Sequence, residues 1–272
     1  MSEVSGIDRL LQVCDRLRDP GGCPWDAEQT RESLRQFAIE EAFEVVEAID
    51  EGSPAALREE LGDLLFQVVF HAKIGKERGE FDFDDVAAGI ADKLIRRHPH
   101  VFEQGDRATD AADAYKRWER IKAEERREEA RRAGVDESEL AAHASALRGI
   151  PEAMPALLRA QRTQDKAART GFDWPSADPV WAKVDEELGE LRDASASGDA
   201  TRVEEELGDL LFSVVNLGRH LGLVAEDALR AAVARFTGRF QTMERAASAD
   251  GKAFDTLSLE EMDALWERAK GS

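Results

Sequence analysis

The octapeptide EELGDLLF stands twice in this chain, at residues 59–66 and again at residues 205–212. Each copy continues with one variable residue and two valines, and each sets two carboxylates three residues apart in an apolar run. Residues three apart lie on one face of an α-helix. Because burying two like charges without partners is costly, these carboxylates must be paired, protonated or bound to a metal ion. The doubled octapeptide therefore predicts two related helices that each carry an acidic site.

The apolar residues around the first copy point in nearly every direction from the helix axis. They are Leu61, Leu64, Leu65, Phe66, Val68, Val69 and Phe70. A helix that is apolar all round belongs in a protein interior, so we expect this helix and its repeat to be buried. Ser53 and Pro54 offer an N-cap and a proline at the first helical position. Asp199 or Thr201 can open the matching helix.

The repeat extends upstream of the octapeptide at a constant offset. Residues 40–52 (EEAFEVVEAIDEG) match residues 186–198 (EELGELRDASASG), which lie 146 residues further along, as the second octapeptide does. A preserved offset means that both halves have the same helix–loop–helix lengths. Each half also begins with a glycine and tryptophan run, GGCPW or GFDW, and ends with WERIK or WERAK. The chain is therefore one structural unit written twice.

A highly charged segment separates the two halves. Residues 122–146 contain almost no large apolar side chains and are interrupted by Gly134, which is typical of a linker, helical at first and irregular after the glycine. We expect an N-terminal domain over residues 1–123, a charged linker over 124–147 and a C-terminal domain over 148–272. Proline is scarce, good helix formers dominate and no strand-like alternation is sustained. The predicted fold class is all-α, with two tandem helical-bundle domains.

The composition limits the partners and the compartment. Acidic residues outnumber basic ones by 57 to 37, and the formal charge of −20 repels nucleic-acid polymers and acidic membranes. No apolar run reaches the ~18 residues that a membrane span needs, and the N-terminus does not resemble a signal peptide. Cys14 and Cys23 form no disulfide framework, so we expect a reducing cytoplasm. A small polyanion could still bind if divalent cations neutralise a local acidic cluster.

Four carboxylates in each half are spaced to meet between two antiparallel helices, as Glu-x-x-Glu on one and Glu-x-x-Asp on the next. These predicted ligands are Glu41, Glu44, Glu60 and Asp63 in the first half and Glu187, Glu190, Glu206 and Asp209 in the second. All-oxygen coordination suits Mg²⁺ or Mn²⁺ and leaves positions open for a phosphate. A solvated acidic face would explain the first helix alone. A di-iron bundle is disfavoured, because none of the five histidines completes its Glu-x-x-His marker.

Basic and aromatic residues that could contact a nucleotide follow in both halves. The basic ones are Lys93, Arg96 and Arg97 in the first half and Arg235 and Arg239 in the second. Arginine can bind a phosphate through two hydrogen bonds. Trp118 and Trp266 could stack on a base, although packing would explain them as well. We interpret the run His98-Pro99-His100 as a helix stop.

With these motifs the sequence resembles the MazG family of nucleoside triphosphate pyrophosphohydrolases, in its two-domain bacterial form. The resemblance spans essentially the whole chain and rests on CPWD, EEAFEV, EELGDLLFQVVFHA, RRHPHVF, WERIKAEER, GFDW, EELGDLLFSVVNLGRHLG and the final tryptophan, Trp266. It implies an all-α fold of tandem MazG-like domains, a homodimer, and Mg²⁺-dependent hydrolysis of NTPs and dNTPs to monophosphate and pyrophosphate. It also implies the metal ligands already deduced from the spacing.

The resemblance places catalysis in the C-terminal half. The substrate-binding residues that it implies are Lys183, Glu186, Glu187, Arg202, Glu205, Arg235, Arg239 and Trp266. Glu186 and Glu205 each adjoin a predicted metal ligand and are the candidates for orienting or deprotonating the attacking water. The first half has Phe37 where the second half has Lys183, and so it lacks a cation that would contact a triphosphate.

Two classes of function stay open at this point. One is a metal-dependent hydrolase. The other is a non-catalytic, metal-stabilised helical scaffold that recruits partners, and the N-terminal half could belong to it beside a catalytic C-terminal half. Each half offers about four helices, two of them strongly apolar, so that a single unit would leave a large patch exposed. We therefore expect a homodimer in which facing copies complete a four-helix core.

Overall fold

The computed structural model describes residues 5–102, 109–134 and 145–271. Within these ranges the chain forms helices and no β-strand, which confirms the all-α prediction. The chain divides into two compact units, Met1–Glu125 and Arg126–Ser272. No helix in the described ranges has both the length and the hydropathy that crossing a membrane requires.

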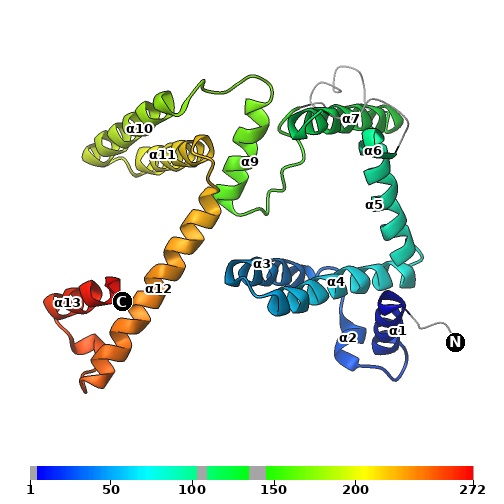
Figure 1. Cartoon of the computed structure of the whole chain (residues 1–272), viewed down its shortest axis with the longest axis horizontal. Helices are drawn as coiled ribbons and strands as arrows, with labels where there is room; N and C mark the ends of the chain where they lie inside the picture. The colour runs from blue at the N-terminus through cyan, green and yellow to red at the C-terminus, as the bar shows by residue number, and fades with distance from the viewer. Residues whose placement is uncertain (1–4, 103–108, 135–144, 272) are drawn as a thin grey trace. The chain divides into compact units, whose positions relative to one another are not determined.

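The first unit is built around a helical hairpin. Its helices are α1 (Gly6–Arg18), α2 (Pro24–Glu28), α3 (Arg35–Glu51), α4 (Pro54–Glu77), α5 (Phe83–Arg97), α6 (Pro99–Phe102) and α7 (Ala111–Arg132), the last of which continues past the end of the unit. Helices α3 and α4 form the hairpin, α1 and α5 pack against α4, and α2 packs against α1 (Figure 1). The predicted linker is thus helical up to Arg132, while its residues 135–144 lie outside the described ranges.

The second unit repeats the hairpin. Its helices are α9 (Ala156–Ala168), α10 (Ala177–Ser197), α11 (Ala200–His220), α12 (Ala225–Ala249), the 3₁₀ helix η1 (Phe254–Thr256) and α13 (Leu259–Lys270). Helices α10 and α11 form the hairpin, and α9 packs against α11 and α12. The long helix α12 leads away from this hairpin and carries α13 (Figure 1).

Matching residues begin and end the helices of the two hairpins. Gly52 ends α3 at a φ of 69° and Gly198 ends α10 at a φ of 76°, a left-handed conformation that glycine adopts without strain. The Ser53 and Asp199 side chains then cap α4 and α11 by accepting backbone N–H groups. Of the two caps considered for the second copy, Asp199 is therefore the one used. The equal turns keep the carboxylates of both halves in the same register.

Each unit has a small buried core. In the first unit the fully buried side chains of Cys14, Leu34 and Phe70 join α1, the start of α3 and α4. Burial raises the pKa of the Cys14 thiol to about 11, so the thiol stays protonated at neutral pH. In the second unit a core centred on Met243 and Leu265 joins α12 to α13.

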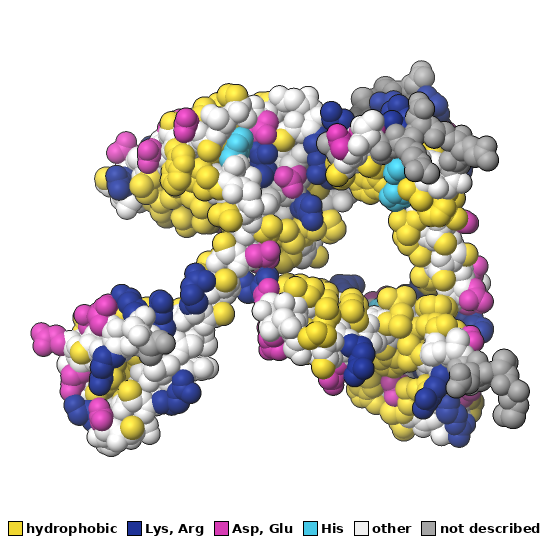
Figure 2. All heavy atoms as spheres, viewed as in Figure 1, with side chains coloured by type: hydrophobic (Ala, Val, Ile, Leu, Met, Phe, Trp, Pro, Cys, Tyr) yellow, Lys and Arg dark blue, Asp and Glu magenta, His cyan; other side chains and the backbone are white. Residues whose placement is uncertain are grey.

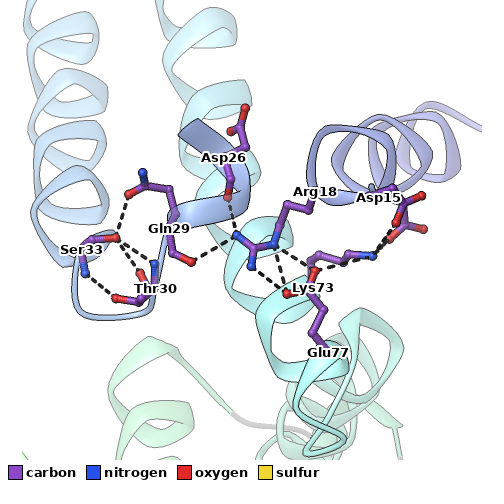
Figure 3. A network of polar contacts seen from close by, with 9 residues as sticks. Asp15, Arg18, Asp26, Gln29, Thr30, Ser33, Lys73 and Glu77 are labelled. Carbon is purple, nitrogen blue, oxygen red and sulfur yellow. Dashed lines mark hydrogen bonds and ion pairs between the residues drawn. The ribbon is translucent and has the colours of Figure 1, made fainter. Parts of the chain in front are cut away.

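A network of ion pairs fixes α1 and α2 against α4 (Figure 3). The Arg18 side chain is 7% exposed, and its guanidinium donates to Glu77 at 2.7 Å and to the backbone carbonyls of Asp26 and Gln29. Lys73 on α4 lies 2.8 Å from Asp15 on α1. These contacts hold the C-terminal half of α4 against α1 and α2. The N-terminal half of the same helix carries Glu60 and Asp63.

The prediction that the octapeptide helices are buried is wrong for the single chain. Leu61, Leu65 and Val68 on α4 are each at least 40% exposed. Their repeat partners Leu207, Leu211 and Val214 on α11 are exposed to the same degree. Figure 2 shows hydrophobic side chains gathered over both hairpins. Each hairpin has too few neighbouring helices in its own unit to cover an all-round apolar helix, so one face stays open.

Candidate functional site

The first hairpin brings three carboxylates together. Oxygen atoms of Glu41 on α3 and of Glu60 and Asp63 on α4 all lie within 4.8 Å of one another, and we call these three residues the first acidic group. Glu44, the fourth predicted ligand, lies beside Glu41 but does not join the group. Partial desolvation, Asp63 and Glu44 together raise the pKa of Glu41. The carboxylates of the first acidic group therefore repel one another, and a bound cation would relieve this repulsion.

The second hairpin repeats this arrangement. Oxygen atoms of Glu187, Glu190 and Glu206 lie within 4.8 Å of one another and form the second acidic group. Glu187 is buried at 4% exposure. Asp209, predicted as the fourth ligand, stays outside the group. Desolvation and the neighbouring Glu206 and Glu187 raise the pKa of Glu190. Three of the four predicted residues therefore converge in each unit, from two facing helices.

Cations lie next to the second group. The Lys183 ammonium is 2.7 Å from Glu187 and 2.9 Å from Glu186. Hydrogen bonds to these two carboxylates raise the pKa of Lys183, which keeps it charged. Arg202 lies 3.6 Å from Glu206 at the start of α11. Each of the two helices that form the second group thus also carries a cation beside it, Lys183 on α10 and Arg202 on α11.

The two candidate residues for water activation lie at the exposed edge of the second group. Glu186 is exposed and bound to Lys183. Glu205 is exposed on α11, one residue before Glu206. Both carboxylates can therefore meet a substrate that approaches from solvent.

The first group differs in the residue one turn before its first carboxylate. Phe37 stands there, and its ring packs edge-on against Trp25 with the centroids 5.9 Å apart. None of the lysines or arginines in the described ranges forms an ion pair with Glu41, Glu60 or Asp63. The absence of a lysine was visible in the sequence, and the structure adds that Phe37 pairs with the ring of Trp25.

Sequence reasoning missed Gln67. This α4 residue is 8% exposed, and its Nε2 lies 3.5 Å from Glu41 Oε1, while its Oε1 has no hydrogen-bond partner within the described structure. A single amide inside an apolar run carries no pattern that would reveal it. Ser213 takes the matching place in the second unit.

Sequence reasoning also missed how the GFDW segment is held. Asp173 of this segment forms an ion pair with Arg219 and lies 3.1 Å from His220, both near the end of α11. The hydrogen bond from Arg219 lowers the pKa of Asp173. The start of α10, which leads to Lys183, is thereby fixed to the end of α11.

The structure places the remaining predicted substrate contacts elsewhere in the second unit. Arg239 on α12 lies over the ring of Trp266 on α13, with its guanidinium carbon 5.8 Å from the centroid. Arg235 is exposed one turn earlier on α12. Helix α13 packs on the part of α12 that leads away from α10 and α11 (Figure 1). Within one chain, these three residues therefore do not converge with the second acidic group.

The first unit has the same pairing of arginine and tryptophan. Arg97 at the end of α5 lies 5.5 Å from the ring centroid of Trp118 on α7, and the Lys122 ammonium lies 4.4 Å from the same centroid. Arg96 and Arg97 both bind Glu125. Two of the three cations predicted as phosphate contacts in this half, Arg96 and Arg97, thus already have partners.

The donor set of both acidic groups fits a hard divalent cation. Each group offers three carboxylate oxygens from two rigid helices, and neither includes a histidine nitrogen or a cysteine sulfur. Mg²⁺ and Mn²⁺ prefer oxygen ligands. In the second group, Glu187, Glu190 and Glu206 would hold the ion.

The chain is similar to known proteins over most of its length. The model of the MazG nucleotide pyrophosphohydrolase domain matches residues 29–102 and 178–243, one match in each unit. The nucleoside triphosphate pyrophosphohydrolase of Escherichia coli strain K12 is 45% identical over 272 residues, covering 98% of each chain. Thermotoga maritima has a nucleoside triphosphate pyrophosphohydrolase/pyrophosphatase MazG that is 45% identical over 265 residues, covering 97% of this chain and 96% of its own. The Mycolicibacterium smegmatis nucleoside triphosphate pyrophosphohydrolase is 31% identical over 239 residues, covering 81% of this chain and 67% of its own. The chain therefore belongs to the MazG nucleotide pyrophosphohydrolase family.

Proposed function

We propose that the chain is a Mg²⁺-dependent nucleoside triphosphate pyrophosphohydrolase, which converts NTPs and dNTPs to the monophosphate and pyrophosphate. The observation that carries this proposal is the second acidic group with Lys183 beside it. The carboxylate oxygens can bind a divalent cation, and the ammonium can bind a negatively charged polyphosphate. The relatives named as nucleoside triphosphate pyrophosphohydrolases support the same reaction class. We assign catalysis to residues 148–272 and a supporting role to residues 1–123.

In this proposal, residues of the second unit bind the substrate and handle one proton. Lys183 and Arg202 contact the phosphates, and Glu186 or Glu205 orients a water molecule toward the α-phosphorus. That carboxylate accepts the proton as the water attacks, and pyrophosphate leaves with the electrons of the broken P–O bond. Bound Mg²⁺ or Mn²⁺ would supply positive charge to the phosphate oxygens and lower the pKa of a water.

We further propose that the protein works as a homodimer. The exposed apolar faces of α4 and α11 support this, since a contiguous apolar surface of this kind usually marks an interface. A second copy could also bring Arg235, Arg239 and Trp266 to the second acidic group, where Trp266 would stack on the base. No polymer of nucleic acid and no membrane is needed for this activity.

The test is to identify the products. A mixed panel of NTPs and dNTPs, incubated with the protein and Mg²⁺, should give NMP and pyrophosphate by ion-exchange chromatography. EDTA should stop the reaction, and added Mg²⁺ or Mn²⁺ should restore it. Release of NDP and orthophosphate would contradict the proposed cleavage site.

A second function is favoured for the first unit alone. Phe37 replaces the lysine, and Arg96 and Arg97 are already bound to Glu125. The first unit is therefore better suited to a metal-stabilised scaffold than to turnover. Titration of the protein with Mn²⁺ alone tests this role, because it requires no turnover.

A further inference from the structure

The two acidic groups differ in what lies beside their most buried carboxylate. At the second group, the Lys183 ammonium lies 2.7 Å from Glu187, whose side chain is 6% exposed. An ammonium so close to a buried carboxylate must be displaced, or must share it, before a divalent cation can bind there. The free second group is therefore partly neutralised by its own lysine.

At the first group, the side chain that contacts the carboxylates is a neutral amide. Gln67 reaches Glu41 through Nε2 at 3.5 Å, and its buried Oε1 has no partner in the described part of the chain. A buried amide oxygen without a hydrogen bond is unfavourable unless something absent from the protein chain supplies one. Water bound to a cation would supply that donor. The unpaired amide oxygen beside Glu41 is thus a second observation, besides the carboxylates, that fits a hydrated cation at the first group.

Phe37 explains why no lysine reaches the first group. It occupies the position that matches Lys183, 146 residues earlier, and its ring is fixed against Trp25. Negative charge at the first group is therefore left uncompensated by any described ion pair. Such a cluster attracts a divalent cation more strongly than one with a built-in ammonium.

We infer that the two units hold divalent cations under different conditions. The first acidic group binds Mg²⁺ or Mn²⁺ without nucleotide and keeps it as a structural ion. At the second group, Lys183 competes for Glu187 until a triphosphate draws the ammonium away, so the cation and the nucleotide bind together. This inference rests on the proposed function, because it treats both groups as cation sites.

The experiment titrates Mn²⁺ alone into the full-length, EDTA-treated protein by isothermal calorimetry. The wild type should show a tight class of sites that Glu60→Gln removes and that the matched Glu206→Gln keeps. Lys183→Met should then tighten Mn²⁺ binding at the second group by about tenfold or more, the low end of the range for residues that contact metal ligands. The side chain of Lys183 is 36% exposed, so this variant should fold normally.

A reciprocal variant tests the first unit. Phe37→Lys should weaken Mn²⁺ binding at the first group by about tenfold, because it places an ammonium where Lys183 stands in the second unit. Phe37 also packs against the core of the first unit, so Phe37→Met is the matched control for lost packing. Thermal unfolding of both variants identifies any loss of fold, and Lys183→Met carries the test if Phe37→Lys unfolds.

Three results would overturn the inference. These are equal Mn²⁺ affinity at both groups of the wild type, no tight binding without nucleotide, and unchanged affinity in Lys183→Met. None of them depends on turnover. If products are NMP and pyrophosphate while Lys183→Met binds Mn²⁺ as the wild type does, the inference fails and the proposed function stands. If NTPs are not hydrolysed at all, the proposed function fails whatever the calorimetry shows.

Discussion

At the scale of single residues, Glu60 and Glu206 form a matched pair, since they lie 146 residues apart and each belongs to one acidic group. Replacing either by glutamine removes one anionic oxygen and keeps the shape. We expect Glu206→Gln to lower the steady-state rate of hydrolysis by about 100-fold, as losses around metal ligands do. Glu60→Gln should cost far less activity and should mainly reduce stability or bound metal.

The comparison between the two variants decides which unit is catalytic. Both should be checked for an unchanged helical circular-dichroism spectrum before rates are compared. If Glu60→Gln abolishes hydrolysis while Glu206→Gln is nearly normal, the assignment of catalysis to the second unit is wrong.

Arg18 permits a prediction about pH. Its hydrogen bond lowers the pKa of Glu77 below the ordinary value of 4.5. A lowered folded-state pKa means that the pair stabilises the protein above about pH 4.5 and loses this effect as the pH falls through the folded-state pKa. Arg18→Met should therefore reduce the free energy of unfolding by about 1–3 kcal/mol at neutral pH, because it also leaves two carbonyls unpaired.

This destabilisation should shrink on acidification, and urea unfolding at about pH 7 and about pH 3 measures it. Arg16 is exposed on the same turn of α1, so Arg16→Met is the control for loss of a positive charge. A difference between wild type and Arg18→Met that is equal at both pH values would show that Glu77 contributes nothing.

The candidate carboxylates could be predicted at this scale, because helical periodicity fixes which residues share a face. Periodicity does not fix rotamers, and for that reason Glu44 and Asp209 share the face but do not join the groups. Gln67 was not predictable, since its role depends on burial and on one contact with Glu41. The pairing of Lys183 with Glu187 follows from their spacing of one turn, although only the structure shows that it is formed.

At the scale of helices, the two hairpins follow directly from the sequence. The Gly and Ser or Asp pairs at residues 52–53 and 198–199 predict where one helix ends and the next begins, and the structure has these ends. Burial of α4 and α11 was not predictable from one chain. Apolar residues all round a helix indicate that it will be covered, but not whether the covering helix belongs to the same molecule.

The open faces of α4 and α11 predict how the helices pair. Leu65 and Leu211 occupy matching positions on these faces and are 40% and 48% exposed. If a second copy covers the surface that remains exposed, each leucine contributes about 0.6–1.5 kcal/mol to association, roughly half of what full burial gives. We expect the wild type to sediment as a dimer at micromolar concentration and the double variant Leu65→Ser/Leu211→Ser to sediment as a monomer.

Leu259 provides the control for this experiment. It is 83% exposed at the start of α13, a helix that belongs to neither hairpin, so Leu259→Ser should leave the sedimentation coefficient unchanged. A wild-type protein that sediments as a monomer would contradict the homodimer, and a double variant that stays dimeric would place the interface elsewhere.

At the scale of the whole molecule, the duplication was the feature easiest to predict from the sequence. An offset of constant length over both helices of the hairpin is hard to explain except by a repeated structural unit. The separation of Trp266 from the second acidic group was not accessible. It depends on the direction in which α12 leaves the hairpin, and no local pattern encodes that direction. The residues that the family resemblance assigns to one substrate site therefore stand apart in one chain.

The course of α12 has a consequence for genetics. If the acidic group of one copy works with Arg239 and Trp266 of another, two inactive alleles can complement each other. Coexpressed Glu206→Gln and Arg239→Met chains would form mixed dimers in about half of the population, each with one intact site, so about a quarter of wild-type activity should return. Either variant expressed alone should be inactive. Failure to recover any activity from verified mixed dimers would mean that each chain completes its own site.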